Sequence, residues 1–342
     1  MNLRFLVLIS LGLATIASKA EDWVVDGTFR VEGLLNGHEM TEAECQPAEN
    51  SLWLTVDGRG DCIRYFHAGL DESGPNRLVH IWLHGDRLSP RWSSRVGHGK
   101  PSNNEPVAYG DSDPAGLEAS AKGIWRTFGV PYIRLSRPGT YGSSGDHKQR
   151  RRPREIELMH AAIEALKARY QIEYLALSGH SGGGHLVGAL LPRRPDLRCA
   201  VIASGNVAPG QRIRLEGWST DTTGYTDWVD PVLLVDNIPV LVTRPIILLA
   251  DPRDQLIWFS SQQLYYQHLH QRGHKVVMFA AKAAGPDYHD LSYLGQNVVR
   301  WCLERRSDNE ILSSTKFLID IIKPGSKKYS RSRDAPSEID RD

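Results

Sequence analysis

Short apolar runs alternate with segments of helical periodicity over most of the chain. Runs typical of buried strands occur at 78–83, 130–135, 174–177, 199–203, 245–250 and 275–280. Apolar residues recur at helical spacing in 115–128, 155–170, 186–191, 260–271 and 290–304. Buried strands that alternate with amphipathic helices predict an α/β fold, a mostly parallel sheet with helices on both faces.

An antiparallel hairpin is predicted before the first parallel strand. Residues 52–66 contain two short strand patterns around the turn pair Asp57-Gly58. Two longer segments, 86–114 and 205–243, fit neither the strand pattern nor the helix pattern. Loops of this length inside a compact domain usually carry function, so we expect both segments to shape a pocket.

The N-terminus has the layout of a secretory signal peptide. Arg4 precedes the apolar run 5–16, and Ser18 and Ala20 supply small residues at the −3 and −1 positions of a cleavage site. We therefore expect residues 1–20 to be removed and the protein to be exported, either to a periplasm or to the medium. The alternative is an uncleaved anchor, for which the run is short. No other stretch is long and apolar enough to predict a transmembrane segment in the mature form.

Charge and composition narrow the function classes. The 342 residues include 41 basic and 40 acidic side chains, a formal net charge of +1. Such a balance provides no general attraction to phosphates, so no nucleic-acid partner is expected. The 41% hydrophobic and 24% charged content is typical of an ordinary globular protein.

Export would make the four cysteines candidates for disulfides. Four cysteines permit three pairings, and the sequence alone does not choose among them. We favour a bond between Cys45 and Cys62, which lie close together in the sequence. Cys199 opens an apolar strand and is expected to be simply buried, which leaves Cys302 without an assigned role. No metal site is expected, because neither a CxxC spacing nor a nearby histidine pair accompanies them.

The strongest chemical signal is Gly179-His180-Ser181-Gly182-Gly183, which matches the pattern G-x-S-x-G. It follows a predicted strand directly and precedes a predicted helix. A serine on so tight a turn needs glycine or another small residue two positions away on each side. The start of the helix would also place backbone N–H groups beside the hydroxyl, where negative charge develops during acyl transfer.

A nucleophilic serine needs a base and an acid that orients it. Asp251 and Asp254 follow the predicted strand 245–250, and His289 follows the predicted strand 275–280. The order serine, aspartate, histidine along the chain is the one found where a G-x-S-x-G turn carries the nucleophile. Both aspartates are therefore candidates for the acid.

Four motifs in this order make the chain resemble the α/β-hydrolase superfamily. They are His84-Gly85-Asp86, Arg137-Pro138-Gly139, residues 179–183, and residues 251–254 followed by His289. The closest resemblance is to exported serine hydrolases similar to the dienelactone hydrolase and prolyl oligopeptidase-type branch, over roughly residues 50–305. It implies an α/β-hydrolase domain at 21–305, followed at 306–342 by a C-terminal helix and a disordered charged tail.

The resemblance also implies a role for each site residue. The nucleophile would be Ser181, the base His289, the acid Asp254, and the oxyanion donors the backbone N–H groups of Gly182 and Asp86. The family places its acid in a G-x-x-D-x-x-V setting, and Asp251 stands where the glycine is expected. Asp251 therefore stays as the alternative acid. No cofactor and no metal is implied.

Other histidines and a run of arginines receive structural interpretations. We expect His84 to be a core residue, His180 to pack or face the cleft, His185 to be structural and His274 to lie on the surface. The run at 150–154, next to His147, is interpreted as a solvated helix start rather than as a site for an anionic substrate.

The sequence thus predicts an exported serine hydrolase that cleaves an ester or amide of a small molecule. The tryptophans of the two long segments favour a substrate with an apolar or aromatic group. One alternative is a serine peptidase of prolyl oligopeptidase type, although the chain has no room for that family's N-terminal propeller. The other is a catalytically silent binding protein on the same fold.

Overall fold

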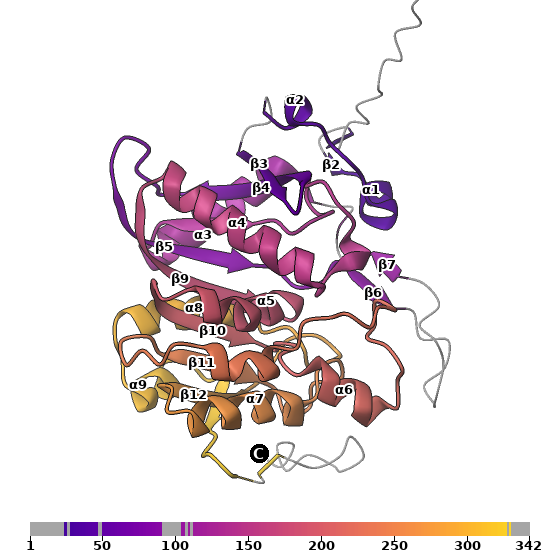
Figure 1. Ribbon diagram of the computed structural model, residues 1–342. Coiled ribbons are helices and arrows are strands. Elements are labelled where there is room, and N and C mark those ends of the chain that lie inside the picture. Colours follow the sequence, from indigo (N-terminus) through magenta and orange to yellow (C-terminus); the bar gives the residue numbers. More distant parts are fainter. Residues whose placement is uncertain are drawn as a thin grey trace, which may run out of the picture.

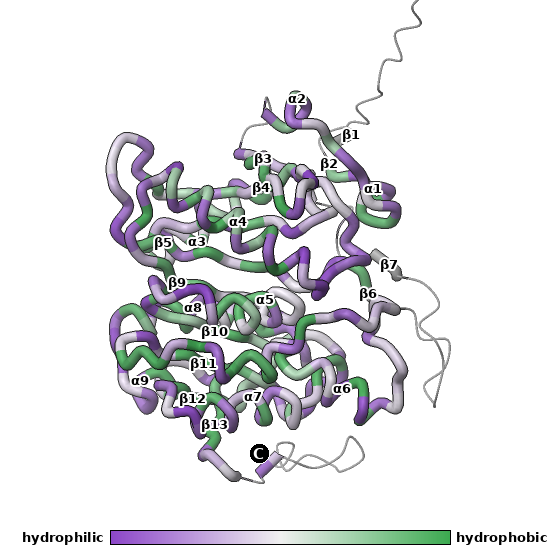
Figure 2. The backbone as a smooth tube through the Cα atoms, viewed as in Figure 1, coloured by the Kyte–Doolittle hydropathy of each residue, from purple (hydrophilic) through white to green (hydrophobic). Residues whose placement is uncertain are grey.

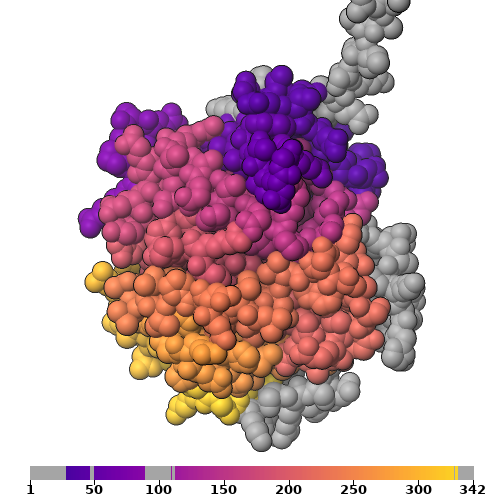
Figure 3. All heavy atoms as spheres, viewed as in Figure 1, coloured from indigo at the N-terminus to yellow at the C-terminus, as the bar shows by residue number. Residues whose placement is uncertain are grey.

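The computed structural model describes residues 24–25, 28–46, 50–90, 104–106, 109, 112–326 and 328–329. The predicted signal peptide and most of the predicted charged tail lie outside these ranges. Figure 3 shows the N-terminal half of the chain in the upper part of the molecule and the C-terminal half directly below it. No helix among the described residues has the length and apolar character needed to cross a bilayer.

A nine-stranded sheet forms the centre of the described structure (Figure 1). Across the sheet its strands are β3 (Ser51–Val56), β4 (Arg59–Ala68), β8 (Tyr132–Leu135), β5 (Asn76–Leu83), β9 (Ile172–His180), β10 (Leu197–Ala203), β11 (Ile246–Ala250), β12 (Val276–Ala281) and β13 (Leu318–Ile321). The six central strands, β8, β5, β9, β10, β11 and β12, are parallel to one another. The outer strands β3, β4 and β13 pair antiparallel at the two edges. The predicted fold class and the N-terminal hairpin are confirmed.

Helices cover both faces of the sheet. The helices α4 (Pro153–Arg169), α5 (Gly182–Leu190) and α7 (Phe259–Gln271) pack on one face, and α3 (Pro114–Phe128) and α8 (Ser292–Leu303) on the other (Figure 1). Every residue of β11 is buried, as expected for a strand covered on both sides. Figure 2 shows the same pattern, with hydrophobic strands inside and hydrophilic loops around them.

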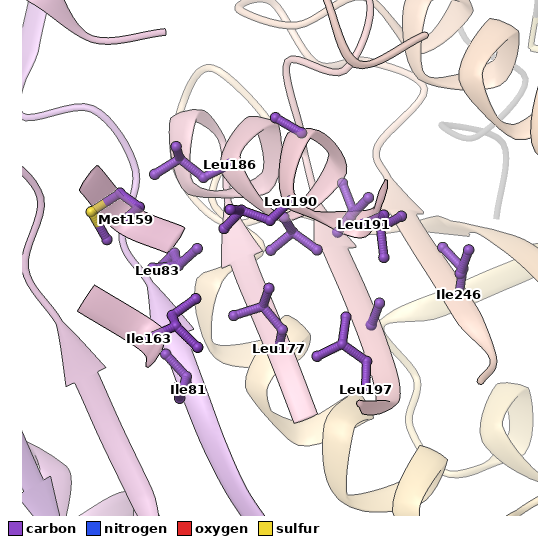
Figure 4. Close-up of a cluster of buried hydrophobic side chains, with 14 of the residues drawn as sticks. Ile81, Leu83, Met159, Ile163, Leu177, Leu186, Leu190, Leu191, Leu197 and Ile246 are labelled. Carbon is purple, nitrogen blue, oxygen red and sulfur yellow. The ribbon is translucent and has the colours of Figure 1, made fainter. Parts of the chain in front are cut away.

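The larger core lies between the sheet and the helices α4, α5 and α7. Figure 4 shows Met159 and Ile163 of α4 beside Leu83 and Ile81 of β5, with Leu177 of β9 next to them. All five side chains are fully buried. This packing fixes α4 and α5 against the strands that end at the candidate site.

The two long segments contain structure of their own. Within 86–114 the strands β6 (Leu88–Pro90) and β7 (Asn104–Pro106) pair antiparallel. Within 205–243 lie the helix α6 (Pro209–Glu216) and a 3₁₀ helix, η3 (Pro231–Asn237). Before the sheet come β1 (Val24–Val25), β2 (Thr28–Phe29), α1 (Val31–Asn36) and α2 (Glu42–Cys45).

The C-terminal segment differs from the expectation. The predicted helix is present as α9 (Asp308–Ser313), but β13 follows it and joins the sheet beside β12. The four residues of β13 are too few to give a strand signal in the sequence, and the neighbouring strand supplies the missing stabilisation. The described residues after 305 therefore include a strand of the sheet and do not only pack on it.

Two disulfides are present, Cys45–Cys62 and Cys199–Cys302. Cys199 is thus not simply buried, because it bonds the start of β10 to the end of α8. The sequence separation of 103 residues hid this pairing from any argument based on proximity. Closing the longer loop restricts the unfolded chain more, and the chain-entropy model gives about 4.7 kcal/mol for it against about 3 kcal/mol for the shorter one.

We therefore expect removal of the second bond to lower the free energy of unfolding more than removal of the first. The comparison uses the double variants C199A/C302A and C45A/C62A in urea denaturation. A larger loss in C45A/C62A would contradict the ranking by loop length.

Candidate active site

Ser181 lies on the sharp turn between β9 and α5. Its φ is 54° and its ψ is −117°, a conformation that is costly for a residue with a side chain. The backbone N–H of Ser181 donates to the carbonyl of Ala203 at 2.9 Å, and its carbonyl accepts from the N–H of His185 at 3.0 Å. The neighbouring strand β10 and the first turn of α5 therefore hold this backbone in place.

The glycines of the turn are required by close backbone contact. A Cβ atom added to Gly179 would lie 2.3 Å from the carbonyl oxygen of Gly183. One added to Gly183 would lie 2.0 Å from the carbonyl oxygen of Leu83, at the end of β5. Any larger residue would force α5 away from the sheet, so the pattern that marked this segment in the sequence has a steric cause.

His289 and Asp254 meet beside this turn. The distance from His289 Nδ1 to Asp254 Oδ2 is 2.8 Å, and Asp254 Oδ1 accepts the backbone N–H groups of Leu256 and Ile257 at 2.8 and 2.9 Å. The Asp254 side chain is fully buried, whereas that of His289 is 11% exposed. The carboxylate is therefore held rigidly, and the imidazole that it bonds is largely buried, with a small part of its surface open to solvent.

Asp251 has a different set of partners. Its carboxylate accepts the backbone N–H of Arg253 at 2.8 Å and that of Ala283 at 2.9 Å, and it pairs with the Arg253 guanidinium at 3.1 Å. These bonds tie the loop after β11 to the loop after β12. Asp251 thus closes a turn and links two loops, while Asp254 is the aspartate that bonds His289.

The backbone of His289 is held by two side chains: His180, which was expected to pack or to face the cleft, and Ser204, which sequence reasoning did not assign to the site. The hydroxyl of Ser204 donates to the His289 carbonyl at 2.8 Å, and His180 Nε2 donates to the same oxygen at 3.0 Å. The His180 and His289 rings are 4.8 Å apart. Burial lowers the pKa of His180 to about 3, so its ring is neutral near pH 7. The only sequence signal for Ser204 is its place directly after the strand beside β9.

The loop after β5 lies against the serine. A Cβ atom added to Gly85 would lie 3.2 Å from Ser181 Cβ, and one added to Gly182 would lie 1.9 Å from Asp86 Oδ1. Gly85 and Asp86 therefore contact both the serine and the first residue of α5. The predicted oxyanion donors, at Gly182 and Asp86, belong to two segments that the structure brings together.

Asp86 is the centre of a buried ion network. Its carboxylate pairs with Arg137 at 2.8 Å, with Arg150 at 2.9 Å and with Arg151 at 2.5 Å. Burial alone would raise the pKa of the Asp86 carboxyl, but the three guanidinium groups outweigh it and hold that pKa well below its usual range. Glu155 and Asp221 balance the remaining charge by pairing with Arg137 and Arg151.

The interpretation of the arginine run as a solvated helix start is therefore wrong for Arg150 and Arg151, whose side chains are 1% and 2% exposed. His147 is buried beside them, and its Nε2 accepts the backbone N–H of Arg87 at 3.1 Å. A run of charges indicates solvent exposure only when no distant carboxylate is available. Here Asp86 lies more than sixty residues earlier in the chain.

The remaining histidines have structural places. His84 is buried, with Nδ1 2.7 Å from the carbonyl of Gly85 and Nε2 3.1 Å from the hydroxyl of Thr140. His185 donates to a backbone carbonyl at 2.8 Å. His274 is 6% exposed, so its predicted surface position is wrong. It stands between α7 and β12, and its backbone N–H donates to the Leu269 carbonyl at 3.1 Å.

Replacing Asp86 by asparagine is expected to lower the free energy of unfolding by about 3 kcal/mol, because three buried guanidinium groups lose their common counter-charge. The matched control is Asp227→Asn, which breaks the exposed pair with Arg152 and should change stability little. Urea denaturation of both variants makes the comparison. Equal stability of the two would contradict an essential role for the network.

No family model matches the chain, and no curated protein matches it either. Among solved structures it is similar to the esterase Pf2001 of Pyrococcus furiosus, with a TM-score of 0.51 and 15% identity over 79% of this chain and 96% of that one. An acylaminoacyl peptidase of Pyrococcus horikoshii aligns at a TM-score of 0.48 and 15% identity, over 75% of this chain and 39% of the peptidase. Est1E of Butyrivibrio proteoclasticus aligns at a TM-score of 0.47 and 13% identity, over 74% of this chain and 98% of its own. The chain has the α/β-hydrolase fold.

Proposed function

We propose that this chain is a serine hydrolase that cleaves a carboxylic ester through Ser181, His289 and Asp254. The observation that carries the proposal is the 2.8 Å contact between His289 Nδ1 and the buried Asp254 carboxylate. The residue before Ser181, His180, also bonds the His289 carbonyl, and Ser181 itself has a φ of 54°. A serine, a histidine and a buried aspartate in this arrangement make a nucleophile, its base and the group that orients the base.

The proposed reaction proceeds in two halves. Ser181 Oγ attacks the ester carbonyl carbon while its proton passes to His289 Nε2, and the imidazolium then protonates the departing alkoxide as the alcohol leaves. Water attacks the resulting acyl-serine by the same route and releases the carboxylic acid and the free serine. Asp254 fixes the tautomer by accepting the Nδ1 proton, and it stabilises the imidazolium that forms at each stage.

The negative charge on the carbonyl oxygen would be stabilised by the backbone N–H groups of Gly182 and Asp86. Two observations support this assignment. Gly182 is the first residue of α5, where N–H groups have no partner within the helix. The Asp86 carboxylate is held by three arginines, which fixes the backbone of the same residue beside Gly182.

An ester is favoured over a peptide because the esterase Pf2001 aligns with this chain over 96% of its own length, at a TM-score of 0.51. The proposed substrate is a small molecule with an apolar or aromatic group, since α6 and its neighbourhood present aromatic side chains. Trp218 lies 5.0 Å from the Arg212 guanidinium, and Trp258 donates to Glu216 at 2.8 Å. A serine peptidase on the same machinery is the alternative.

The test is labelling with a fluorophosphonate, followed by kinetics on matched p-nitrophenyl esters and p-nitroanilides of the same acyl groups. We expect one labelled serine per chain, at Ser181 in the peptide map, and faster cleavage of the esters. If the protein is labelled but cleaves only the anilides and not the esters, it is a peptidase. A folded protein that is not labelled at any serine would refute the proposal and leave a binding protein.

We also propose that the enzyme works outside the cytoplasm, which the two disulfides support. The mature N-terminus should then be Glu21. N-terminal sequencing of the protein recovered from the periplasm or medium of an expressing cell measures it. Recovery there with Met1 intact would contradict cleavage of the leader.

A further inference from the structure

A pocket lies at the amino ends of the parallel strands, on the side of the sheet opposite to Ser181. It has a volume of about 630 Å³, and its walls come from the starts of the parallel strands, the end of α8 and the start of α9. Tyr174 near the start of β9 lines it, while Ser181 follows the end of the same strand. At about 3.3 Å per residue, the two positions are about 23 Å apart. The pocket is therefore separate from the candidate active site.

The rim of this pocket is strongly basic. Its only charged lining residues are Arg77, Arg198, Lys275, Arg305, Arg306 and Asp308. Arg306 pairs with Glu304 at 2.7 Å, and Arg198 stacks on Tyr174 with its guanidinium carbon 3.4 Å from the ring centre. The other three cations are Arg77, Lys275 and Arg305, and no carboxylate of the described residues pairs with them. They are exposed, so they are available to an anion from solution.

The floor of the pocket is apolar. It is formed by Leu78, Ile247, Val276, Val277, Leu303 and Ile311. Val242 stands at the edge with 78% of its surface exposed, the highest value among the large hydrophobic side chains of the described residues. The bond between Cys199 and Cys302 ties the α8 wall to β10, so the floor exists before any ligand arrives. A preformed apolar pocket with a few polar groups at its rim is typical of a small-molecule site.

We propose that this pocket binds a fatty acid, with its carboxylate on the arginines of the rim and its hydrocarbon chain on the apolar floor. The planar guanidinium matches a carboxylate through two parallel hydrogen bonds. The apolar floor argues for an amphiphile, because a polyanion such as a nucleic acid would contact the rim and leave the floor and Val242 uncovered. This binding site is independent of the hydrolysis proposed above.

The experiment is a titration of the full mature chain with cis-parinaric acid, a fluorescent fatty acid, below its critical micelle concentration. We expect saturable binding that weakens with ionic strength, displacement by dodecanoic acid and little displacement by dodecanol. The double variant R77Q/R305Q should weaken binding at least about 10-fold, because it removes two charged hydrogen-bond donors. Val242→Asp should weaken it too, through repulsion of the carboxylate and loss of apolar contact.

The matched control is K122Q/R126Q, which removes two exposed positive charges from α3 without touching the pocket. Its affinity should equal that of the unmodified protein, and thermal denaturation shows that each variant is folded. Three results would each overturn the proposal: equal affinity of R77Q/R305Q and the control, equal displacement by acid and alcohol, or binding only when the lipid is in vesicles. Because Ser181 is unchanged in every variant, failure here leaves the proposed hydrolysis untouched.

Discussion

Ser181→Ala is expected to abolish fluorophosphonate labelling and to lower kcat by about 10⁶, the scale of loss when a triad nucleophile is removed. The variant lacks the oxygen that forms the acyl intermediate, so any residual catalysis comes from substrate binding and from the oxyanion donors. The fold should be retained, because the turn is held by backbone bonds to Ala203 and His185 that alanine also makes. Thermal denaturation and labelling of the same sample separate loss of chemistry from loss of structure.

The control is Ser178→Ala, three residues earlier in β9. Ser178 is fully buried and bonds His80 at 2.6 Å, so this variant loses a hydroxyl and a hydrogen bond on the same strand. It should lose about 1 kcal/mol of stability and keep most of its activity. Retained labelling of the Ser181→Ala variant would assign the nucleophile to another serine and dismantle the proposed site.

The parallel strands could be predicted because each is buried on both faces and therefore reads as a continuous apolar run. β11 is the clearest case, with five buried residues in succession. The ends of the strands were harder to predict from the sequence. β9 extends to His180, beyond the predicted end at 177, because the last residues of the strand are selected for the turn and its contacts rather than for hydrophobicity.

Contacts between residues that lie far apart in the sequence were the main feature that could not be predicted. The sequence could not show that Cys199 bonds Cys302, because the partner is chosen by the packing of α8 on β10. It also gave the wrong environment for Arg150 and Arg151, whose counter-charge is the Asp86 carboxylate on another loop. In each case the local pattern was interpreted correctly for an isolated segment, and a tertiary contact overrode it.

The sequence analysis named Asp254 and His289 from their positions after successive strands, and the structure places these two side chains 2.8 Å apart. The parallel strands β9, β11 and β12 have their carboxyl ends on the same side of the sheet, and Ser181, Asp254 and His289 follow those ends. What the spacing could not choose was the aspartate, since Asp251 and Asp254 leave the same strand end only three residues apart. Their different hydrogen bonds now make the choice testable.

Asp254→Asn is expected to lower kcat by about 10⁴ while leaving the protein folded. The amide oxygen can still accept the N–H groups of Leu256 and Ile257, so the loop keeps its shape. The amide nitrogen, however, would donate to His289 Nδ1 and force the proton to Nε2, where it blocks acceptance of the serine proton. Asp251→Asn instead weakens the bonds to Arg253 and Ala283, with an expected loss of about 2 kcal/mol of stability and a small change in kcat. Steady-state kinetics and urea denaturation of both variants measure the two effects, and the reverse pattern would make Asp251 the catalytic acid.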